Sequence, residues 1–206
     1  TQCRHEMPLT QHHLNPENEA FTKFYGRIAV EHVSALLYFQ KKGIVQELIH
    51  SLKYRGQEEI GFVLGNWYAE ELKNNPILST VDALLPAHVD HTTPVPLHPK
   101  KLRERGYNQV AEFGKALAAE LNIPVNNEIL FRQVYSKTQS QKDFLGRSEG
   151  INTIFDVSFT KNEENKHFLL IDDVLTTGAT LEGCAKAVLK IPGAKISIVC
   201  MAMAHS

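Results

Sequence analysis

The chain has few cysteines, no long apolar stretch and almost no net charge, and each of these features bears on the class of protein. Of its 206 residues only three are cysteines, and they are far apart and odd in number, which argues against a disulfide framework and favours a reducing, cytoplasmic location. No apolar stretch approaches the roughly 20 residues that a membrane span needs, and no signal peptide is recognisable. Lys plus Arg (22) nearly balance Asp plus Glu (23), giving a net charge of −1. This balance does not support nucleic-acid binding by the whole molecule, although a local basic patch is compatible with it.

The length and the pattern of apolar residues indicate one sizeable α/β domain, with or without a small appendage. Segments with a strand pattern alternate with segments whose apolar residues recur at helical spacing. Strands are expected at 33–39, 81–85, 129–134, 154–159, 167–174 and 196–202, and helices at 44 to about 54, 58–72, 108–121 and 180–191. This alternation predicts a mostly parallel sheet flanked by helices, with right-handed crossovers. Cys184 and Cys200 fall within these elements and are expected to be buried.

The most informative segment is 168–180, Phe-Leu-Leu-Ile-Asp-Asp-Val-Leu-Thr-Thr-Gly-Ala-Thr. Its apolar run fits a buried parallel strand, and Asp172 and Asp173 then lie near the carboxyl end, where open α/β sheets bind ligands. Two adjacent carboxylates can accept hydrogen bonds from neighbouring hydroxyls, such as a ribose 2′,3′-diol. The loop that follows offers hydroxyls and backbone N–H groups at a helix N-terminus, which favours a phosphate. Its residues are Thr176, Thr177, Gly178, Ala179 and Thr180. The segment therefore predicts a site for a sugar monophosphate.

A second segment, 94–109, is basic. It has four cations within six residues, Lys100, Lys101, Arg103 and Arg105. By itself this pattern is most simply a solvated basic helix start, but such cations also suit pyrophosphate, and arginine forks bind phosphate oxygens with two hydrogen bonds.

The two acids followed by Thr-Thr-Gly-Ala-Thr resemble the signature of type I phosphoribosyltransferases. The segment Pro-Val-Pro-Leu-His-Pro-Lys-Lys-Leu-Arg-Glu-Arg-Gly-Tyr-Asn-Gln, at 94–109, resembles the ComF-type members of that family. The resemblance extends to Leu-Lys-Tyr-Arg-Gly at 52–56 and to a scattered pattern between 132 and 152. The matching residues of that pattern are Arg132, Thr138, Gln139, Leu145, Arg147 and Asn152.

This resemblance implies a type I phosphoribosyltransferase fold, with an N-terminal hood at 1–80 and a core at 81–206. It implies that the loop binds the 5′-phosphate of phosphoribosyl pyrophosphate (PRPP), and that Asp172 and Asp173 hold the ribose and stabilise it as it reacts. Mg²⁺ would be held mainly by substrate oxygens and water. Residues 135–150 would form a lid. Pyrophosphate contacts are implied for Leu97, His98, Pro99, Lys100 and Lys101, with Arg103, Arg105, Arg132 and Arg147 as further substrate-binding residues.

Two parts of the chain depart from the family pattern. Residues 87–94 are extra relative to it, and although His88, Asp90 and His91 are of the types that bind metals, nothing else supports a metal site, so a solvated loop is expected. ComF-type proteins often begin with a four-cysteine zinc ribbon, and residues 3–9 resemble the sequence around its last cysteine.

Structural zinc normally takes four ligands, and Cys3 alone is present of the four cysteines. Cys3 with His5, His12 and His13 could in principle form a substitute set. The preferred interpretation is that the chain is a fragment, so that Zn²⁺ binds only if upstream cysteines exist in the full-length protein.

Two classes of function follow from the resemblance. The first is transfer of phosphoribosyl from PRPP to an unknown nitrogen nucleophile, with release of pyrophosphate. The second is non-enzymatic: PRPP sensing, or an accessory role in DNA uptake with single-stranded DNA and a helicase. The DNA contacts would be Lys100, Lys101, Arg103, Arg105, Lys137, Lys142 and Arg147.

One question stays open in the sequence. Lys53, Tyr54 and Arg55 either face the substrate or simply satisfy the carbonyl groups at a helix C-terminus.

Overall fold

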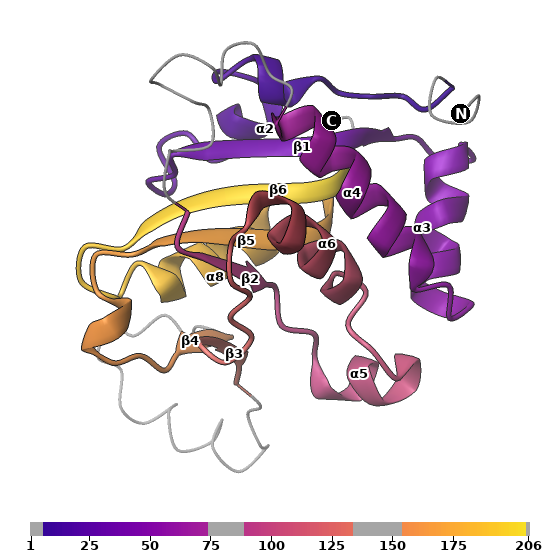
Figure 1. Cartoon of the computed structure of the whole chain (residues 1–206). Helices are drawn as coiled ribbons and strands as arrows, with labels where there is room; N and C mark the ends of the chain where they lie inside the picture. Colours follow the sequence, from indigo (N-terminus) through magenta and orange to yellow (C-terminus); the bar gives the residue numbers. More distant parts are fainter. Residues whose placement is uncertain (1–5, 74–88, 134–153, 205–206) are drawn as a thin grey trace, which may run out of the picture.

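A four-stranded parallel sheet forms the centre of the computed structural model, which describes residues 6–73, 89–133 and 154–204 (Figure 1). The strand order is β1, β6, β5, β2, and every neighbouring pair is parallel. The strands are β1 (His32–Phe39), β2 (His91–Pro94), β5 (His167–Leu175) and β6 (Lys195–Ala204). Because the strands are parallel, their carboxyl ends meet at one edge of the sheet, and this edge carries the candidate site.

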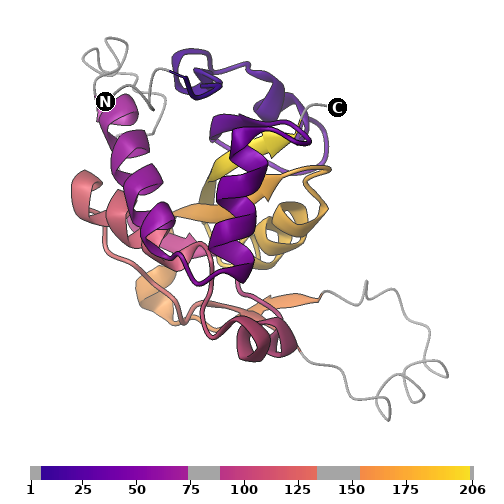
Figure 2. The same cartoon turned by 90° about the vertical axis from the view of Figure 1, so that its right-hand side faces the viewer.

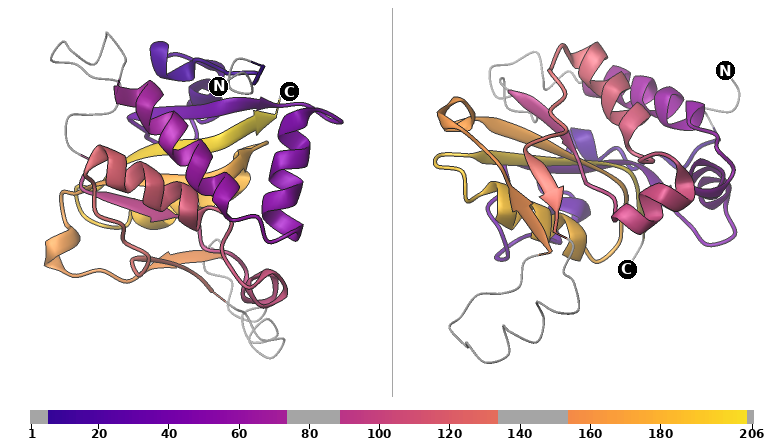
Figure 3. Two further views of the ribbon diagram at one scale, coloured as in Figure 1. Left: turned by 45° about the vertical axis from the view of Figure 1, so that its right-hand side comes forward. Right: turned by 90° about the horizontal axis from the view of Figure 1, so that it is seen from below.

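Helices cover both faces of the sheet, so β5 and β6 are buried on both sides, as their continuous apolar runs predict (Figure 3). On one face, Leu169 and Ile171 of β5 pack in the cluster formed with α3, α4 and α6. On the other, Phe168 and Leu170 pack in the cluster that includes α8 and the α2 segment. α3 and α4 contact each other, and Figure 2 shows them side by side. The helices are α2 (Glu19–Thr22), α3 (Ile44–Tyr54), α4 (Glu59–Lys73), α6 (Ala111–Leu121) and α8 (Ala179–Val188).

Shorter elements complete the described chain. Strands β3 and β4 form an antiparallel ribbon against α8, and α5 follows β2. The N-terminal segment runs along β1, where Tyr38 N–H donates to the Pro8 carbonyl (2.8 Å). These elements are η1 (His12–Leu14), α5 (Pro99–Arg105), β3 (Leu130–Arg132), β4 (Phe155–Val157) and η3 (Lys161–Glu163).

The predicted parallel α/β architecture is confirmed, and most elements lie within a few residues of their expected positions. Cys184 and Cys200 are buried free thiols, as expected. β1 comes from within the first 80 residues and forms an edge of the central sheet, so the N-terminal region contributes directly to the core. The expected boundary near residue 80 and the expected strand 81–85 lie outside the described residues, as do Cys3 and His5.

The expectation that residues 87–94 form a solvated insertion is wrong for the part that the structure describes. His91–Pro94 is strand β2, in register with Phe168–Ile171 of β5, and Thr92 and Thr93 are buried. Asp90, just before the strand, accepts hydrogen bonds from the Lys166 ammonium (2.8 Å) and the His167 N–H (2.9 Å). A search for apolar residues does not predict a polar strand of this kind, although β-branched threonines are favourable in a pleated sheet.

Within the described ranges, no group of three or more His, Cys, Asp and Glu side chains is arranged to hold a metal ion. None of the helices in those ranges has the length and apolar character needed to cross a membrane.

Candidate functional site

Two neighbouring carboxylates, Asp172 and Asp173, form the centre of the candidate site. They lie near the carboxyl end of β5, with β6 on one side and β2 on the other. Burial, together with the negative charge of Asp173, raises the pKa of Asp172 to about 7. Asp172 can therefore change protonation near neutral pH, and a ligand that needs both carboxylates ionised binds better as pH rises.

The loop after β5 forms a small hollow of about 40 Å³, which Asp172 lines together with residues 174–181. Gly178 has a φ of +78°, and a Cβ added there would lie 3.0 Å from the Phe24 ring. Two features therefore disfavour a side chain at position 178: the backbone conformation and the packing of the N-terminal segment against it. α8 begins directly after Gly178, so the N–H groups of its first turn face the loop, where the N–H of Ala179 donates to Thr177 Oγ1 (3.4 Å).

Arg27, in the N-terminal segment, contacts both this loop and α8. Its guanidinium donates to the Thr177 carbonyl (3.1 Å) and forms an ion pair with Glu182 on α8. The sequence contains no local signal for this contact, because Arg27 lies 150 residues away from the loop.

Lys53 connects α3 to the acid pair. Its Nζ lies 2.8 Å from Oδ2 of Asp173, and the two side chains are only 22% and 17% exposed. Arg55 turns back onto its own helix, where it lies 3.9 Å from Glu47. Of the residues whose direction the sequence left open, Lys53 therefore lies against the acid pair and Arg55 does not, and a contact of Lys53 with substrate stays a prediction.

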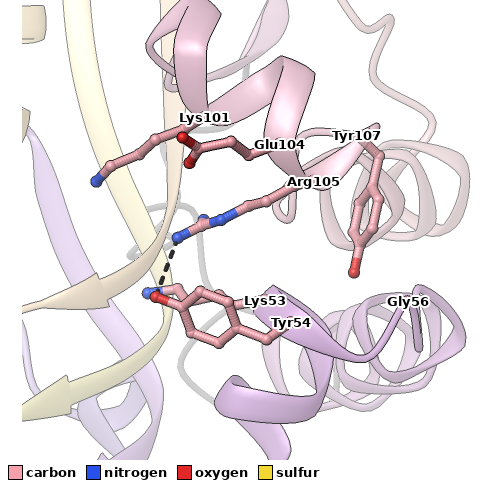
Figure 4. A pocket seen from close by; sticks show the side chains of 7 residues that line it. All are labelled: Lys53, Tyr54, Gly56, Lys101, Glu104, Arg105 and Tyr107. Carbon is pink, nitrogen blue, oxygen red and sulfur yellow. Dashed lines mark hydrogen bonds between the residues drawn. The ribbon is translucent and has the colours of Figure 1, made fainter.

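A pocket of about 290 Å³ lies between the last turn of α3 and α5 (Figure 4). The Arg105 guanidinium lies over the Tyr54 ring, 5.0 Å from its centroid, and donates to the Tyr54 hydroxyl at 3.3 Å. Arg105 also bonds the Gln109 side chain, and the Tyr107 hydroxyl donates to the Leu52 carbonyl. The residues that line the pocket are Lys53, Tyr54, Gly56, Lys101, Glu104, Arg105 and Tyr107.

The position of α5 follows from its connection to the sheet. Val95 N–H donates to the Ile171 carbonyl (2.8 Å), which continues the pairing of β2 with β5. The Asn108 side chain donates to the Val95 carbonyl (3.0 Å), and His98 caps α5 by accepting from the Lys100 N–H (3.1 Å). α5 thus starts beside the carboxyl end of β5, near the acid pair.

Not all the predicted residues converge on this site. Leu97, His98 and Pro99 form the turn into α5, and Lys101 and Arg105 line its pocket. Lys100 instead lies 3.9 Å from Glu104, and Arg103 is exposed and does not line the pocket.

Arg132 lies on β3 with its guanidinium 5.2 Å from the centre of the Phe155 ring. Arg147 and the rest of the expected lid, 135–150, lie outside the described residues.

Comparisons with known proteins agree with this architecture. Residues 111–206 match the model of the phosphoribosyl transferase domain. The chain is 33% identical over 106 residues to competence protein F of Haemophilus influenzae, which covers 51% of this chain and 46% of that protein. It is 30% identical over 149 residues to competence protein ComFC of Bacillus subtilis, covering 71% and 54%. It is 26% identical over 154 residues to DNA utilization protein YhgH of Escherichia coli, covering 75% and 65%.

The parallel sheet, with its acid pair and loop, and the match of residues 111–206 to the phosphoribosyl transferase domain together support a member of the phosphoribosyltransferase family. Its similarity to competence protein F and ComFC supports a ComF-type member. The matched regions span 46% to 65% of the lengths of the three relatives.

Proposed function

We propose that this protein binds PRPP and transfers its phosphoribosyl group to a nitrogen nucleophile, with release of pyrophosphate. The observation that carries the proposal is the continuity of the site. Asp172 lines the hollow of the phosphate loop, while Lys53 bonds Asp173 and also lines the cationic pocket beside α5. A sugar held on the two acids would have its 5′-phosphate on one side and its reacting end on the other.

In this proposal each part of the chain binds or orients one part of PRPP. The N-terminus of α8 and the threonine hydroxyls bind the 5′-phosphate, and the acid pair accepts hydrogen bonds from the ribose hydroxyls. The turn into α5 and its cations receive the pyrophosphate. The acceptor nitrogen bonds to C1 of the ribose while the C1–O bond to pyrophosphate breaks, and that electron pair leaves with pyrophosphate. The ring becomes positive during this exchange, so nearby carboxylates stabilise it.

Mg²⁺ is compatible with this site if substrate oxygens supply most of its ligands. The two acids do not form a complete metal cage with other described residues, but Mg²⁺ commonly takes one or two carboxylates and completes its shell with water and phosphate oxygens. When bound, Mg²⁺ would neutralise charge on the pyrophosphate group. Asp172 and Asp173 are the residues of this chain that could contact it or its waters.

Calorimetric titration of PRPP in the presence of Mg²⁺ tests the binding step. The unmutated protein should bind, and Asp172→Asn and Asp173→Asn should each weaken binding at least about tenfold, the loss expected when a hydrogen bond to a charged group is removed. Glu112→Gln is the matched control, because Glu112 pairs with Lys115 on α6 and takes no part in the site. Absence of binding by the unmutated protein contradicts the proposal. Pyrophosphate release with candidate amines and bases then tests turnover.

A second function is supported by the names of the relatives, which refer to competence and DNA utilization. In this alternative the protein is a cytoplasmic accessory factor that senses PRPP or contacts single-stranded DNA through the exposed cations of α5. A gel shift with single-stranded DNA at several salt concentrations tests it, because phosphate contacts weaken steeply with salt. Binding that is lost in Lys100→Gln/Arg103→Gln, together with no pyrophosphate release, would favour this alternative over transfer.

A further inference from the structure

The N-terminal segment at 18–28 packs against the loop that the proposed function gives to the 5′-phosphate. Its start is fixed to the sheet by Asn18, which is only 5% exposed. The Asn18 side chain donates to the Val33 carbonyl of β1 (2.9 Å) and caps α2 by accepting from the Phe21 N–H (3.0 Å). The segment therefore approaches the loop from a fixed point on β1, far away in the sequence.

Phe24 makes the apolar contact between the segment and the loop. Its side chain is fully buried, and its Cζ and Cε1 lie 3.0 and 3.1 Å from the place that a Cβ on Gly178 would occupy. The Phe24 carbonyl accepts from the N–H groups of Arg27 (3.0 Å) and Ile28 (3.3 Å), which fixes the backbone that carries the ring. The ring therefore limits how far Gly178 can move towards the N-terminal segment.

Arg27 makes the polar contact, and it fixes the direction of one peptide group. Its guanidinium donates to the Thr177 carbonyl (3.1 Å) and pairs with Glu182 on α8. No peptide bond of the described residues is cis, and the C=O and N–H of a trans peptide point in opposite directions. Because the Thr177 carbonyl points to Arg27, the N–H of Gly178 points away from it, and Gly178 is one of the residues that line the hollow of the loop.

We propose that Phe24 and Arg27 are positioning residues that make this site select a 5′-phosphorylated sugar. Neither side chain lines the hollow, so both act through the backbone of the loop. Together they hold the peptide between Thr177 and Gly178 so that its N–H meets the phosphate, and a bound phosphate fixes the segment at 18–28 in return. This inference rests on the proposed function and adds the residues that set its preference for the 5′-phosphate.

Ribose 5-phosphate and pyrophosphate are the probes, because each represents one part of PRPP. Both are titrated by calorimetry, in the presence of Mg²⁺, into the whole chain. Phe24→Tyr adds a hydroxyl at Cζ, the ring atom closest to the Cβ position of Gly178, and should weaken ribose 5-phosphate about tenfold while leaving pyrophosphate unchanged. Lys101→Gln, in the pocket beside α5, should do the reverse. Phe62→Tyr is the matched control, because Phe62 is a 50% exposed ring on α4, and it should change neither probe.

Two further comparisons test the contacts separately. Arg27→Lys keeps the charge but cannot donate to the loop and to α8 with one planar fork, so it should recover only part of the ribose 5-phosphate affinity lost in Arg27→Met. The Arg27 side chain is 38% exposed, so these two variants decide the matter if Phe24→Tyr does not fold, as circular dichroism will show. Gly178→Ala should weaken ribose 5-phosphate less in a Phe24→Leu background, because the shorter side chain leaves room for the added methyl group. Hydrogen exchange followed by NMR should show that ribose 5-phosphate protects the N–H groups of Arg27 and Ile28.

The outcomes separate this inference from the proposed function. If ribose 5-phosphate and pyrophosphate weaken equally in Phe24→Tyr, the ring serves the fold alone and the inference is overturned. If ribose 5-phosphate binds the unmutated protein and every variant of Phe24 and Arg27 equally well, the inference is refuted and the PRPP site stands. If neither ribose 5-phosphate nor PRPP binds the unmutated protein, the proposed function fails, and this role of Phe24 and Arg27 fails with it.

Discussion

Replacing Lys53 by Met removes the cation that joins α3 to the acid pair. The side chains of Lys53 and Asp173 are largely buried, with Nζ and Oδ2 2.8 Å apart. A carboxylate has lone pairs to spare, so Asp173 can bond Lys53 and a ribose hydroxyl together. We therefore expect Lys53 to support PRPP binding without having to leave the acid pair.

The size of the effect follows from the contact. Lys53 also lines the cationic pocket proposed for the pyrophosphate, where a hydrogen bond between charged groups contributes about 1.5–3 kcal/mol. The remaining exposure of Lys53 reduces the expected loss to about 1–2 kcal/mol, or roughly 5- to 30-fold in PRPP affinity. The pH dependence has a definite sign. Ribose hydroxyls need ionised carboxylates, and the pKa of Asp172 is raised to about 7, so binding should strengthen as pH rises through this value. The positive charge of Lys53 lowers that pKa, so Lys53→Met should move the midpoint upward.

Calorimetric titration of PRPP with Mg²⁺ from about pH 6 to about pH 9 measures both quantities. Lys53→Arg keeps the charge and should restore most of the affinity and the midpoint. Lys115→Met removes a lysine of α6 whose side chain is 60% exposed, and it should change neither. The reasoning is refuted if Lys53→Met leaves affinity and midpoint unchanged, or if PRPP binds more tightly to it.

Three further predictions concern the loop and the buried histidine. Gly178 has a φ of +78° and lies against Phe24, so Gly178→Ala should lower the free energy of unfolding by about 1–2 kcal/mol in thermal unfolding. It should also weaken PRPP binding more than tenfold. A variant with unchanged stability and affinity would contradict this description of the loop. Arg27→Met removes the hydrogen bond to the Thr177 carbonyl and should therefore weaken PRPP binding. It should lower the free energy of unfolding by at most about 1 kcal/mol, because the ion pair with Glu182 is partly exposed. A larger loss of stability would show that Arg27 serves the fold and not the binding of PRPP. His32 is buried and its pKa is lowered to about 4, so the unfolded chain binds the proton better. Stability in urea should therefore fall as pH drops from 6.5 towards 4, and less steeply in His32→Gln, whereas parallel pH profiles would contradict this.

The sequence predicted those parts of the site that are contiguous in the chain. Asp172 to Thr180 forms one strand end, loop and helix start, so spacing alone places its acids and N–H groups together. The apolar runs of β5 and β6 made a buried parallel sheet predictable for the same reason. His91–Pro94 was missed because its polar side chains do not give the apolar pattern of a buried strand, and its pairing with β5 is a tertiary contact that a local pattern does not contain.

Contacts between distant segments could not be read from spacing. Lys53 lies 120 residues before Asp173, and its direction depends on how α3 packs over the sheet. The Leu-Lys-Tyr element marked Lys53 as a candidate, whereas Arg27 carried no mark at all. The cations of α5 looked equivalent in sequence, but helix geometry separates Lys101 and Arg105, which line the pocket, from Arg103, which does not. The roles of all these residues towards PRPP stay predictions.

The most direct test of the central claim is a crystal structure of this chain with PRPP and Mg²⁺. The account predicts the 5′-phosphate in the loop at 176–180, the ribose hydroxyls within hydrogen-bond distance of Asp172 and Asp173, and the pyrophosphate beside the turn into α5. PRPP bound elsewhere, or bound with its ribose away from both acids, would contradict it.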